Sequence, residues 1–235
     1  MFVHKTTSFS IYFGDAQESV SLQEISLQQN TQALKNIAQQ LQIDQVALLR
    51  QEHGTQGLQI KFDDNQKYFF SPTGDYLFTQ KLECGIGVVT ADCLPIVLHD
   101  PITKTVGIIH AGWRGLSAGV FQITIQKIID AIGVESSDLE IYLGPAARPC
   151  CYEVQQDFVD QFQKYNNDSE FFIKKESKIY FDSRTFILVL ARNLGISEEK
   201  IYTKYNVCTI CNESYCSYRR EKEKARRQIS MICLH

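Results

Sequence analysis

The chain has 235 residues, of which 44% are hydrophobic and 22% are charged, as is typical of a globular protein. Its formal net charge of −3 gives no general field that would attract nucleic acid. The longest uninterrupted apolar run, Phe186–Ala191, is far too short to cross a bilayer, and the first residues lack the apolar segment of a signal peptide. We therefore expect a cytoplasmic protein with eight reduced cysteines, no membrane or nucleic-acid partner, and an oligomeric state that the sequence does not specify.

The first half of the chain is expected to form one helix followed by four strands. Ser21–Gln42 has apolar residues at helical spacing, which predicts an amphipathic helix. Four apolar runs predict strands, and they are Val46–Arg50, Gly85–Val89, Pro95–His99 and Thr105–His110. The pair Asp100-Pro101 marks a turn between the last two runs, which indicates a hairpin.

The second half is expected to be mainly helical. Its expected elements, in order, are a helix over Gly115–Ile132 that ends at Gly133, a strand over Leu139–Leu143, a helix over Val154–Tyr165 and a helix over Ser183–Asn193 that begins with Ser183 as its cap. Helices and strands do not alternate strictly, and there is no glycine-rich phosphate loop. The pattern predicts one α+β domain that spans residues 1–235.

Two of the five histidines stand where sites are commonly built. His53 and His110 each follow a predicted strand and lead into a glycine-containing loop, where small residues permit close approach. Cys93 lies in "TADCLP", and Pro95 restricts the residue before it to extended geometry. Two imidazoles and a thiolate suit a zinc ion with an open fourth position, or copper. Cys93 with His110 also suits a nucleophile pair, and a buried core thiol remains an alternative.

Five motifs occur in order along the chain: "QEHGTQ", "TADCLPIVLHD", "IIHAGWRG", "LGPAARPCCYEV" and "SYRR". Together they resemble the bacterial polyphenol-oxidoreductase or laccase-domain family, whose members are now understood as purine nucleoside phosphorylases and are also called peptidoglycan editing factors. The resemblance implies a compact single-domain α/β sandwich, with mixed sheets flanked by helices. It also implies a zinc ion held by His53, Cys93 and His110, which would make these residues both metal ligands and catalytic residues.

The function implied by the resemblance is phosphorolysis of a purine nucleoside, with phosphate as the second substrate. Adenosine and inosine are the expected nucleosides, methylthioadenosine is a further one, and adenosine deamination is a second expected activity. Arg114 follows His110 in a glycine-flanked loop, and we expect its guanidinium to bind phosphate. Arg148 is a weaker candidate for the same role, and Asp92 is expected either to orient a ligand or relay a proton, or to cap a turn.

Five cysteines of the second half require their own interpretation. Cys150 and Cys151 are adjacent and cannot both face one way along a strand. We expect Cys208, Cys211 and Cys216 to bind no second metal, because no fourth ligand is evident in "CTICNESYC". The basic run Arg219–Arg227 is expected to be a solvated face, with Arg219 or Arg220 as an alternative phosphate contact.

Three other functions are alternatives to the zinc-dependent nucleoside enzyme. A metal-independent cysteine hydrolase that acts on cell-wall precursors would use Cys93 and His110. A copper-dependent polyphenol oxidase is disfavoured, because five histidines are too few for several copper centres. A zinc-stabilised binding module without catalysis is the third.

Overall fold

The computed structural model describes residues 1–21, 24, 32–61, 68–165 and 170–235, and within these ranges the chain forms two large sheets and one small one. The first sheet is mixed and follows the order β1-β2-β16-β8-β4-β6, with β3 paired to β16. Its strands are β1 (Phe2–Lys5), β2 (Phe9–Phe13), β3 (Ser19–Val20), β4 (Gln45–Arg50), β6 (Tyr68–Thr73), β8 (Cys84–Thr90) and β16 (Arg227–Leu234).

The second sheet is also mixed and follows the order β15-β11-β9-β10-β7-β5. Its strands are β5 (Gly57–Gln59), β7 (Tyr76–Thr79), β9 (Leu94–Asp100), β10 (Thr105–Ala111), β11 (Glu140–Leu143) and β15 (Ile201–Tyr202). The helices and short 3-10 turns are α2 (Gln32–Leu41), α3 (Trp113–Ala118), α4 (Val120–Ile132), η1 (Ser136–Asp138), α5 (Gln156–Asp160), η2 (Gln163–Tyr165), α6 (Ser183–Asn193), η3 (Glu198–Lys200), α7 (Tyr218–Glu221) and η4 (Lys222–Lys224).

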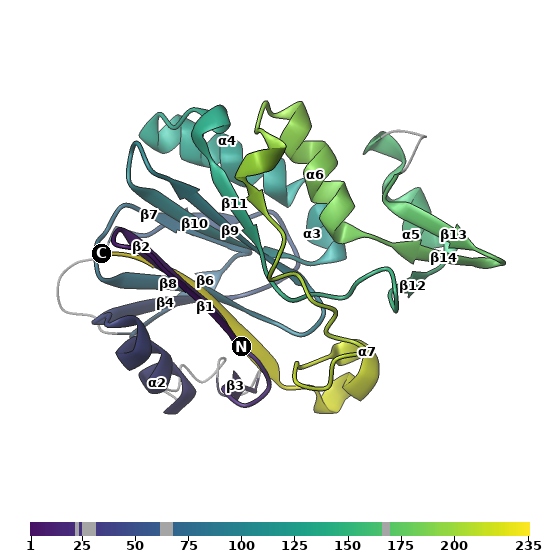
Figure 1. The fold of residues 1–235 in the computed structure, drawn as a ribbon, viewed down its shortest axis with the longest axis horizontal. Helices are drawn as coiled ribbons and strands as arrows, with labels where there is room; N and C mark the ends of the chain where they lie inside the picture. The colour runs from purple at the N-terminus through teal and green to yellow at the C-terminus, as the bar shows by residue number, and fades with distance from the viewer. Residues whose placement is uncertain (22–23, 25–31, 62–67, 166–169) are drawn as a thin grey trace.

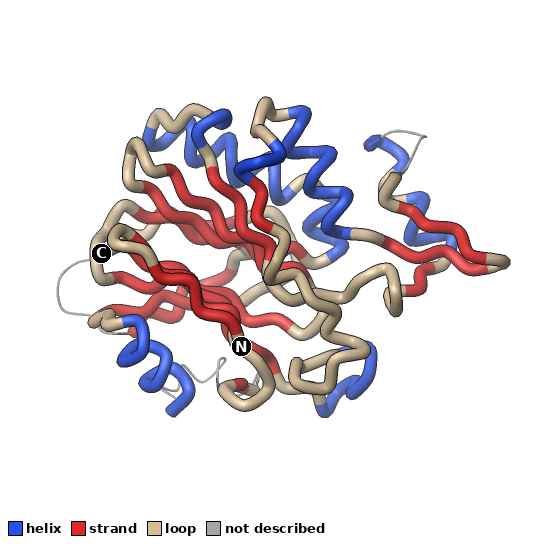
Figure 2. The backbone as a smooth tube through the Cα atoms, in the orientation of Figure 1, coloured by secondary structure: helices blue, strands red, loops and turns tan. Residues whose placement is uncertain are grey.

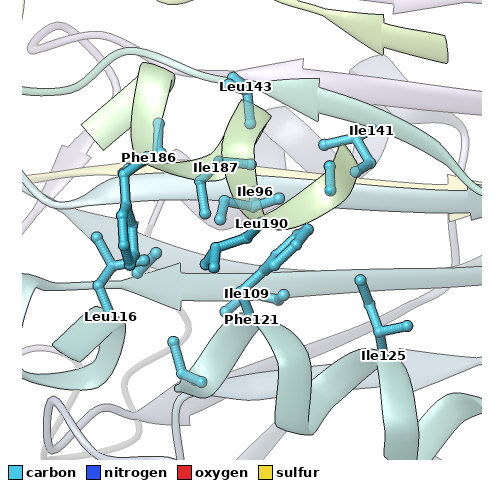
Figure 3. Close-up of a cluster of buried hydrophobic side chains, with 14 of the residues drawn as sticks. Ile96, Ile109, Leu116, Phe121, Ile125, Ile141, Leu143, Phe186, Ile187 and Leu190 are labelled. Carbon is cyan, nitrogen blue, oxygen red and sulfur yellow. The ribbon is translucent and has the colours of Figure 1, made fainter. Parts of the chain in front are cut away.

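The two large sheets face each other, and helices cover their outer faces (Figures 1 and 2). An apolar core that includes Ile86, Val97 and Ile108 fills the space between the sheets. A second core lies between the second sheet and the helices α3, α4 and α6, where the side chains point toward one another (Figure 3). Helix α2 packs on the outer face of the first sheet. The predicted α/β sandwich is thus confirmed.

Most of the predicted elements are present, because strongly periodic apolar runs bury one face. Helix α2 buries Leu34, Ile37, Ala38 and Leu41, which are the residues that define the expected helix face. The earlier part of that expected helix lies largely outside the described residues. Strands β9 and β10 form the expected antiparallel hairpin, with His110 opposite Pro95.

Two predicted boundaries are wrong. The expected helix over Gly115–Ile132 is two helices, α3 and α4, because Gly119 adopts a left-handed φ of 100° and ends α3. Gly133 ends α4 as expected, with a φ of 83°. The cap of α6 is Asp182 rather than Ser183, since the Asp182 carboxylate accepts from the backbone N–H groups of the first turn.

The expected helix over Val154–Tyr165 is not continuous, because it is divided into shorter elements. Residues Glu153–Val154 form β12, which joins β14 (Lys178–Phe181) and β13 (Phe172–Lys175) in a three-stranded sheet. Only α5 and the short turn η2 are helical. Phe158 and Phe162 stack on each other and pack on Phe181, so their periodic spacing reflects an aromatic cluster rather than a continuous helix.

Candidate functional site

The three predicted ligand residues come together at the ends of strands from both large sheets. His53 follows β4 and adopts a left-handed φ of 61°, Cys93 lies between β8 and β9, and His110 is near the end of β10. Their potential ligand atoms all lie within 4.8 Å of one another. His53 is the most exposed of the three and His110 is the most buried. The sequence separations of the three residues gave no indication of this proximity.

The donor set and its geometry fit a tetrahedral metal ion. The Cys93 Sγ atom lies 3.8 Å from His53 Nε2. With bonds of about 2.3 Å to sulfur and about 2.0 Å to nitrogen, the sulfur and nitrogen ligands of a tetrahedral zinc ion are about 3.5 Å apart. Three protein ligands leave one coordination position for water or substrate, which is the arrangement of catalytic rather than structural zinc sites.

A buried carboxylate, that of Asp75, organises this ligand set. Asp75 is 1% exposed, and its carboxylate accepts from His110 Nδ1 at 2.7 Å. It also accepts from the backbone N–H groups of His53 at 2.9 Å and Gly54 at 2.6 Å. An Nδ1–H that donates to a carboxylate leaves Nε2 of His110 free to bind a metal. Asp75 was missed in the sequence, where "GDY" between two apolar runs looks like an ordinary turn.

The same contacts perturb the ionisation of the cysteine and the histidine. Burial opposes ionisation of Cys93, but the adjacent imidazoles of His110 and His53 lower the pKa of its thiol to about 6. Burial likewise opposes protonation of His110, but Cys93 and Asp75 raise the pKa of its imidazole to about 9. A neutral solution therefore favours a thiolate beside an imidazolium in the metal-free site, and metal binding would release the imidazolium proton.

Gly112 permits the close approach of the ligand residues. A Cβ atom at this position would lie 2.6 Å from His53 Cδ2 and 3.3 Å from Cys93 Sγ. The first distance is well inside van der Waals contact, so any side chain here would displace the His53 ring. The small residue in "HAGWRG" is thus required by the packing of His53 and Cys93.

The three ligand residues line a cavity of about 680 Å³, a size that suits a small organic ligand. Among the described residues, its lining includes five cationic side chains, which are Arg50, Arg114, Arg219, Lys222 and Arg227, but only one carboxylate, that of Asp92. Aromatic residues also line the cavity, and they are Trp113, Tyr152, Phe181 and Tyr218. The cavity therefore combines apolar walls with an excess of positive charge.

Arg114, which is expected from the sequence to bind phosphate, lines this cavity. Its guanidinium carbon lies 4.5 Å from the centroid of the Trp113 ring, so the ring supports the arginine through a cation–π contact. Arg219 also lines the cavity, stacks on Tyr152 at 5.3 Å and donates to the Glu153 carbonyl. Of the two arginines of "SYRR", the structure thus places Arg219 at the cavity.

Arg148 and Arg220 lie elsewhere and bind backbone carbonyls. Arg148 donates from Nη1 to the Asn206 carbonyl at 2.7 Å and is not among the residues that line the cavity. Arg220 donates to the carbonyls of Thr209, Ile210 and Tyr215. Both side chains therefore hold the loop before α7 in place.

Asp92 connects three segments at the edge of the cavity. Its carboxylate accepts from Thr209 Oγ1 at 2.7 Å and from the Arg219 backbone N–H at 2.6 Å. Its carbonyl accepts from the Ala147 backbone N–H at 2.9 Å. Asp92 also has a left-handed φ of 84°. These contacts favour a positioning role for Asp92 over proton transfer.

The C-terminal cysteines have different surroundings from those expected. Cys208 and Cys211 lie beside Cys150 and Cys151, and the four sulfur atoms are all within 4.8 Å of one another. Cys150 and Cys151 lie in a turn rather than a strand, so both can face the same neighbours. Cys216 is buried in a separate cluster with Ala91 and Ala225. The premise that no fourth ligand accompanies Cys208 and Cys211 is therefore wrong.

A sequence model of the family described as "Multi-copper polyphenol oxidoreductase laccase" matches residues 6–235. The chain belongs to this laccase family. Its relatives include a purine nucleoside phosphorylase of Clostridium acetobutylicum, which is 28% identical over 97% of this chain and 93% of its own length. Another relative, a purine nucleoside phosphorylase of Aquifex aeolicus, is 35% identical over 68% of this chain and 71% of its own.

Solved structures of similar proteins have the same fold as this laccase-family chain. Hypothetical protein YfiH of Bacillus licheniformis superposes with a TM-score of 0.81 and 22% identity, over 97% of this chain and 93% of its own. YlmD of Geobacillus stearothermophilus gives a TM-score of 0.80 at 21% identity, over 98% and 93% of the two chains. In the described part of this family member, no helix has the length and apolar character needed to cross a membrane.

Proposed function

We propose that the protein is a zinc-dependent purine nucleoside phosphorylase that acts on adenosine and inosine, and also on methylthioadenosine. A phosphate oxygen would form a bond to the anomeric carbon of the sugar, while the glycosidic bond breaks and the base leaves with the bonding electron pair and takes up a proton. The products are the free base and ribose 1-phosphate or methylthioribose 1-phosphate. The cavity beside His53, Cys93 and His110, rich in cations and aromatic rings, is the observation that carries this proposal.

Phosphate is the substrate for which the charges of the cavity are best suited. Arg114 and Arg219 each have their guanidinium supported by an aromatic ring, Trp113 and Tyr152 respectively. Stacked guanidinium groups keep their planar donors directed, which favours paired hydrogen bonds to a phosphate. The remaining cations of the lining add favourable potential for a dianion, because Asp92 is the one carboxylate among the described lining residues.

The aromatic residues of the lining are suited to the nucleoside. Trp113 and Tyr152 offer apolar faces beside the ligand set, and a purine gains from stacking on such faces. Holding the sugar and the phosphate together in one cavity removes much of the entropic cost of the bimolecular step. These residues would therefore act mainly by binding and orientation.

Zinc is the metal that the ligand residues fit best in this proposal, and His53, Cys93 and His110 would hold it. Two imidazoles and a thiolate with an open position match a catalytic zinc site. When bound, zinc would supply a Lewis acid next to the nucleoside, and this chemistry also suits adenosine deamination as a second activity. Asp75 would keep the proton on His110 Nδ1 and so fix the ring orientation. A multicopper oxidase is disfavoured, because the described potential ligand groups contain two histidines in all.

A turnover assay tests the activity. Purified protein with adenosine, inosine or methylthioadenosine should release free base only when phosphate is present, and chromatography should detect the sugar 1-phosphate. Arg114→Lys keeps the charge but loses the paired donors, so phosphate binding should weaken by about 1–3 kcal/mol and raise the phosphate KM. Arg192→Lys is the matched control, since Arg192 is an exposed residue of α6 outside the cavity lining.

The outcomes separate the function from the role of Arg114. Failure of every purine nucleoside to release base in a phosphate-dependent manner would remove the proposed activity. A phosphate KM unchanged in Arg114→Lys would remove only the role of that arginine. The zinc content and the folding of both variants should equal those of the parent protein.

A metal-independent cysteine hydrolase that acts on cell-wall precursors is the second candidate. The observation that favours it is the Cys93–His110 pair, in which the low thiol pKa of about 6 resembles that of an activated nucleophile. Retention of full hydrolytic activity toward such precursors after complete removal of metal by a chelator would support this candidate. Loss of that activity together with the metal would exclude it.

A further inference from the structure

We infer that the chain binds a second zinc ion, in a closed site formed by the sulfur atoms of Cys150, Cys151, Cys208 and Cys211. The four sulfur atoms come from two turns and lie within 4.8 Å of one another. This site is separate from the His53, Cys93 and His110 set, and it does not depend on the proposed nucleoside reaction. None of its four cysteines lines the cavity.

The distances between the sulfur atoms fit four ligands of one ion. Cys150 Sγ lies 3.9 Å from Cys211 Sγ. With zinc–sulfur bonds of about 2.3 Å, the edges of a zinc tetrathiolate are about 3.8 Å long. A disulfide would require about 2.0 Å. All eight cysteines of the chain are free thiols, and these four have their sulfur atoms within 4.8 Å of one another.

The backbone holds the two turns together without using the cysteine side chains. Ala146 pairs with Cys208 in an isolated parallel bridge. The Ala146 N–H donates to the Val207 carbonyl at 3.0 Å, and the Thr209 N–H donates to the Ala146 carbonyl at 3.0 Å. The Arg148 guanidinium adds its bond to the Asn206 carbonyl. The sulfur atoms are therefore positioned before any metal arrives, which reduces the entropic cost of binding.

The exposure of the cluster suits a site that takes up metal from solution. Cys208 is buried at its base, whereas Cys150 and Cys211 are exposed at its surface. The backbone N–H groups of Cys211, Arg148 and Ile210 face the sulfur atom of Cys208. Such N–H groups offset the negative charge of a metal-bound thiolate.

The ligand type selects the metal and the role. Four thiolates in tetrahedral arrangement are typical of zinc, and the spacing of Cys208 and Cys211 as C-x-x-C is common in such sites. Four protein ligands leave no open position, so the ion would be structural. It would join the turn before Tyr152 to the loop that carries Thr209, two segments that meet at Asp92 on the cavity edge.

Metal analysis of variants tests this inference. The full chain, purified under anaerobic conditions, should contain about two equivalents of zinc, and Cys93→Ala should retain about one. The double variant Cys208→Ser/Cys211→Ser should lose the other equivalent, and Cys216→Ala, a cysteine outside both clusters, should lose none. Because the double variant removes two ligands from the fold, the milder Cys150→Ser, at an exposed sulfur, provides a second test: it should weaken retention of this zinc about 10-fold or more in a chelator titration.

Cobalt substitution adds a readout that leaves the four cysteines of the cluster unchanged. Cobalt in the cysteine cluster should give the intense sulfur-to-metal absorption of a tetrathiolate, and Cys93→Ala should keep that absorption. One zinc equivalent that is lost in Cys93→Ala and kept in the double variant would overturn the inference. The inference would also be overturned if Cys150 and Cys211 form a disulfide and the cluster still binds no zinc after that disulfide is reduced. If the parent chain holds a single zinc equivalent, and Cys93→Ala keeps it while the double variant loses it, the result would support the cysteine cluster and contradict the site of His53, Cys93 and His110.

Discussion

Replacing Asp75 by asparagine tests whether this buried carboxylate organises the metal ligands. The substitution keeps the shape of the side chain but removes its charge and one of its two acceptor oxygens. In the structure, the Oδ1 atom of Asp75 accepts from His110 Nδ1 and the His53 N–H, and Oδ2 accepts from the Gly54 N–H. An asparagine amide group must therefore face at least one of these donors.

The magnitude follows from which donor loses its partner. If the amide group faces Gly54, that buried N–H loses its acceptor, at a cost of about 1–3 kcal/mol in the free energy of unfolding. If the amide group faces His110, the ring no longer has an acceptor that holds its proton on Nδ1. Loss of a partner that orients a metal ligand lowers metal affinity about 10- to 100-fold. This range corresponds to about 1.4–2.8 kcal/mol of binding free energy.

The assay is a competition titration of zinc against a chelator of known affinity, with thermal unfolding measured in parallel. Asp100→Asn is the matched control, because Asp100 is also 1% exposed and its carboxylate accepts from Ile102 and Thr103. Asp100 ends β9, whose other end is next to Cys93, and at about 3.3 Å per residue it lies about 20 Å from the ligand set. The control should lose stability without losing affinity at the His53, Cys93 and His110 site.

Two results would refute the reasoning. Unchanged zinc affinity of that site in Asp75→Asn would show that the carboxylate does not orient His110. An equal loss of affinity in Asp100→Asn would show that general destabilisation, rather than the loss of the His110 contact, explains the effect.

Further predictions concern the packing around the site and in the core. Gly112→Ala should weaken the retention of one zinc equivalent while the chain stays folded, because the added Cβ would lie 2.6 Å from His53 Cδ2. Metal analysis measures the zinc content and circular dichroism measures the folding. Full retention of zinc would contradict the steric argument. Phe186→Ala should lower the free energy of unfolding by about 3–5 kcal/mol, since this fully buried ring of α6 lies in the core between that helix and the second sheet. Denaturant titration measures the free energy of unfolding. A loss below about 1 kcal/mol would contradict this prediction and show that the neighbouring side chains fill the space left by the ring.

The sequence predicted the strongly periodic elements well and their irregular ends poorly. Strands such as β9 and β10 are recognisable because every residue along them is buried, and the helix face of α2 repeats at a spacing that only a helix satisfies. The break at Gly119 was missed because the apolar periodicity of the two helices continues across it. The division of the expected helix over Val154–Tyr165 into α5 and η2 was missed because an aromatic cluster also gives periodic apolar spacing.

The residues of the candidate metal site were predicted from motifs, but their supporting contacts were not. His53, Cys93 and His110 occur in distinctive motifs, and the structure brings their ligand atoms within 4.8 Å. Asp75 belongs to none of these motifs, so nothing local marks it as a partner of His110. Arg148 was an anion candidate on its position in a motif, whereas its guanidinium contacts a backbone carbonyl.

The sequence by itself determined the fold class, the core faces of the main elements and the chemical types of the ligands, because these depend on local periodicity and on residue identity. The tertiary structure alone decided which side chains meet. Cys151 and Cys208 are separated by more than 50 positions in the chain, and a bridge between Ala146 and Cys208 places their turns side by side. Such proximity results from the pairing and packing of distant segments, which has no signature in the spacing of residues along one chain.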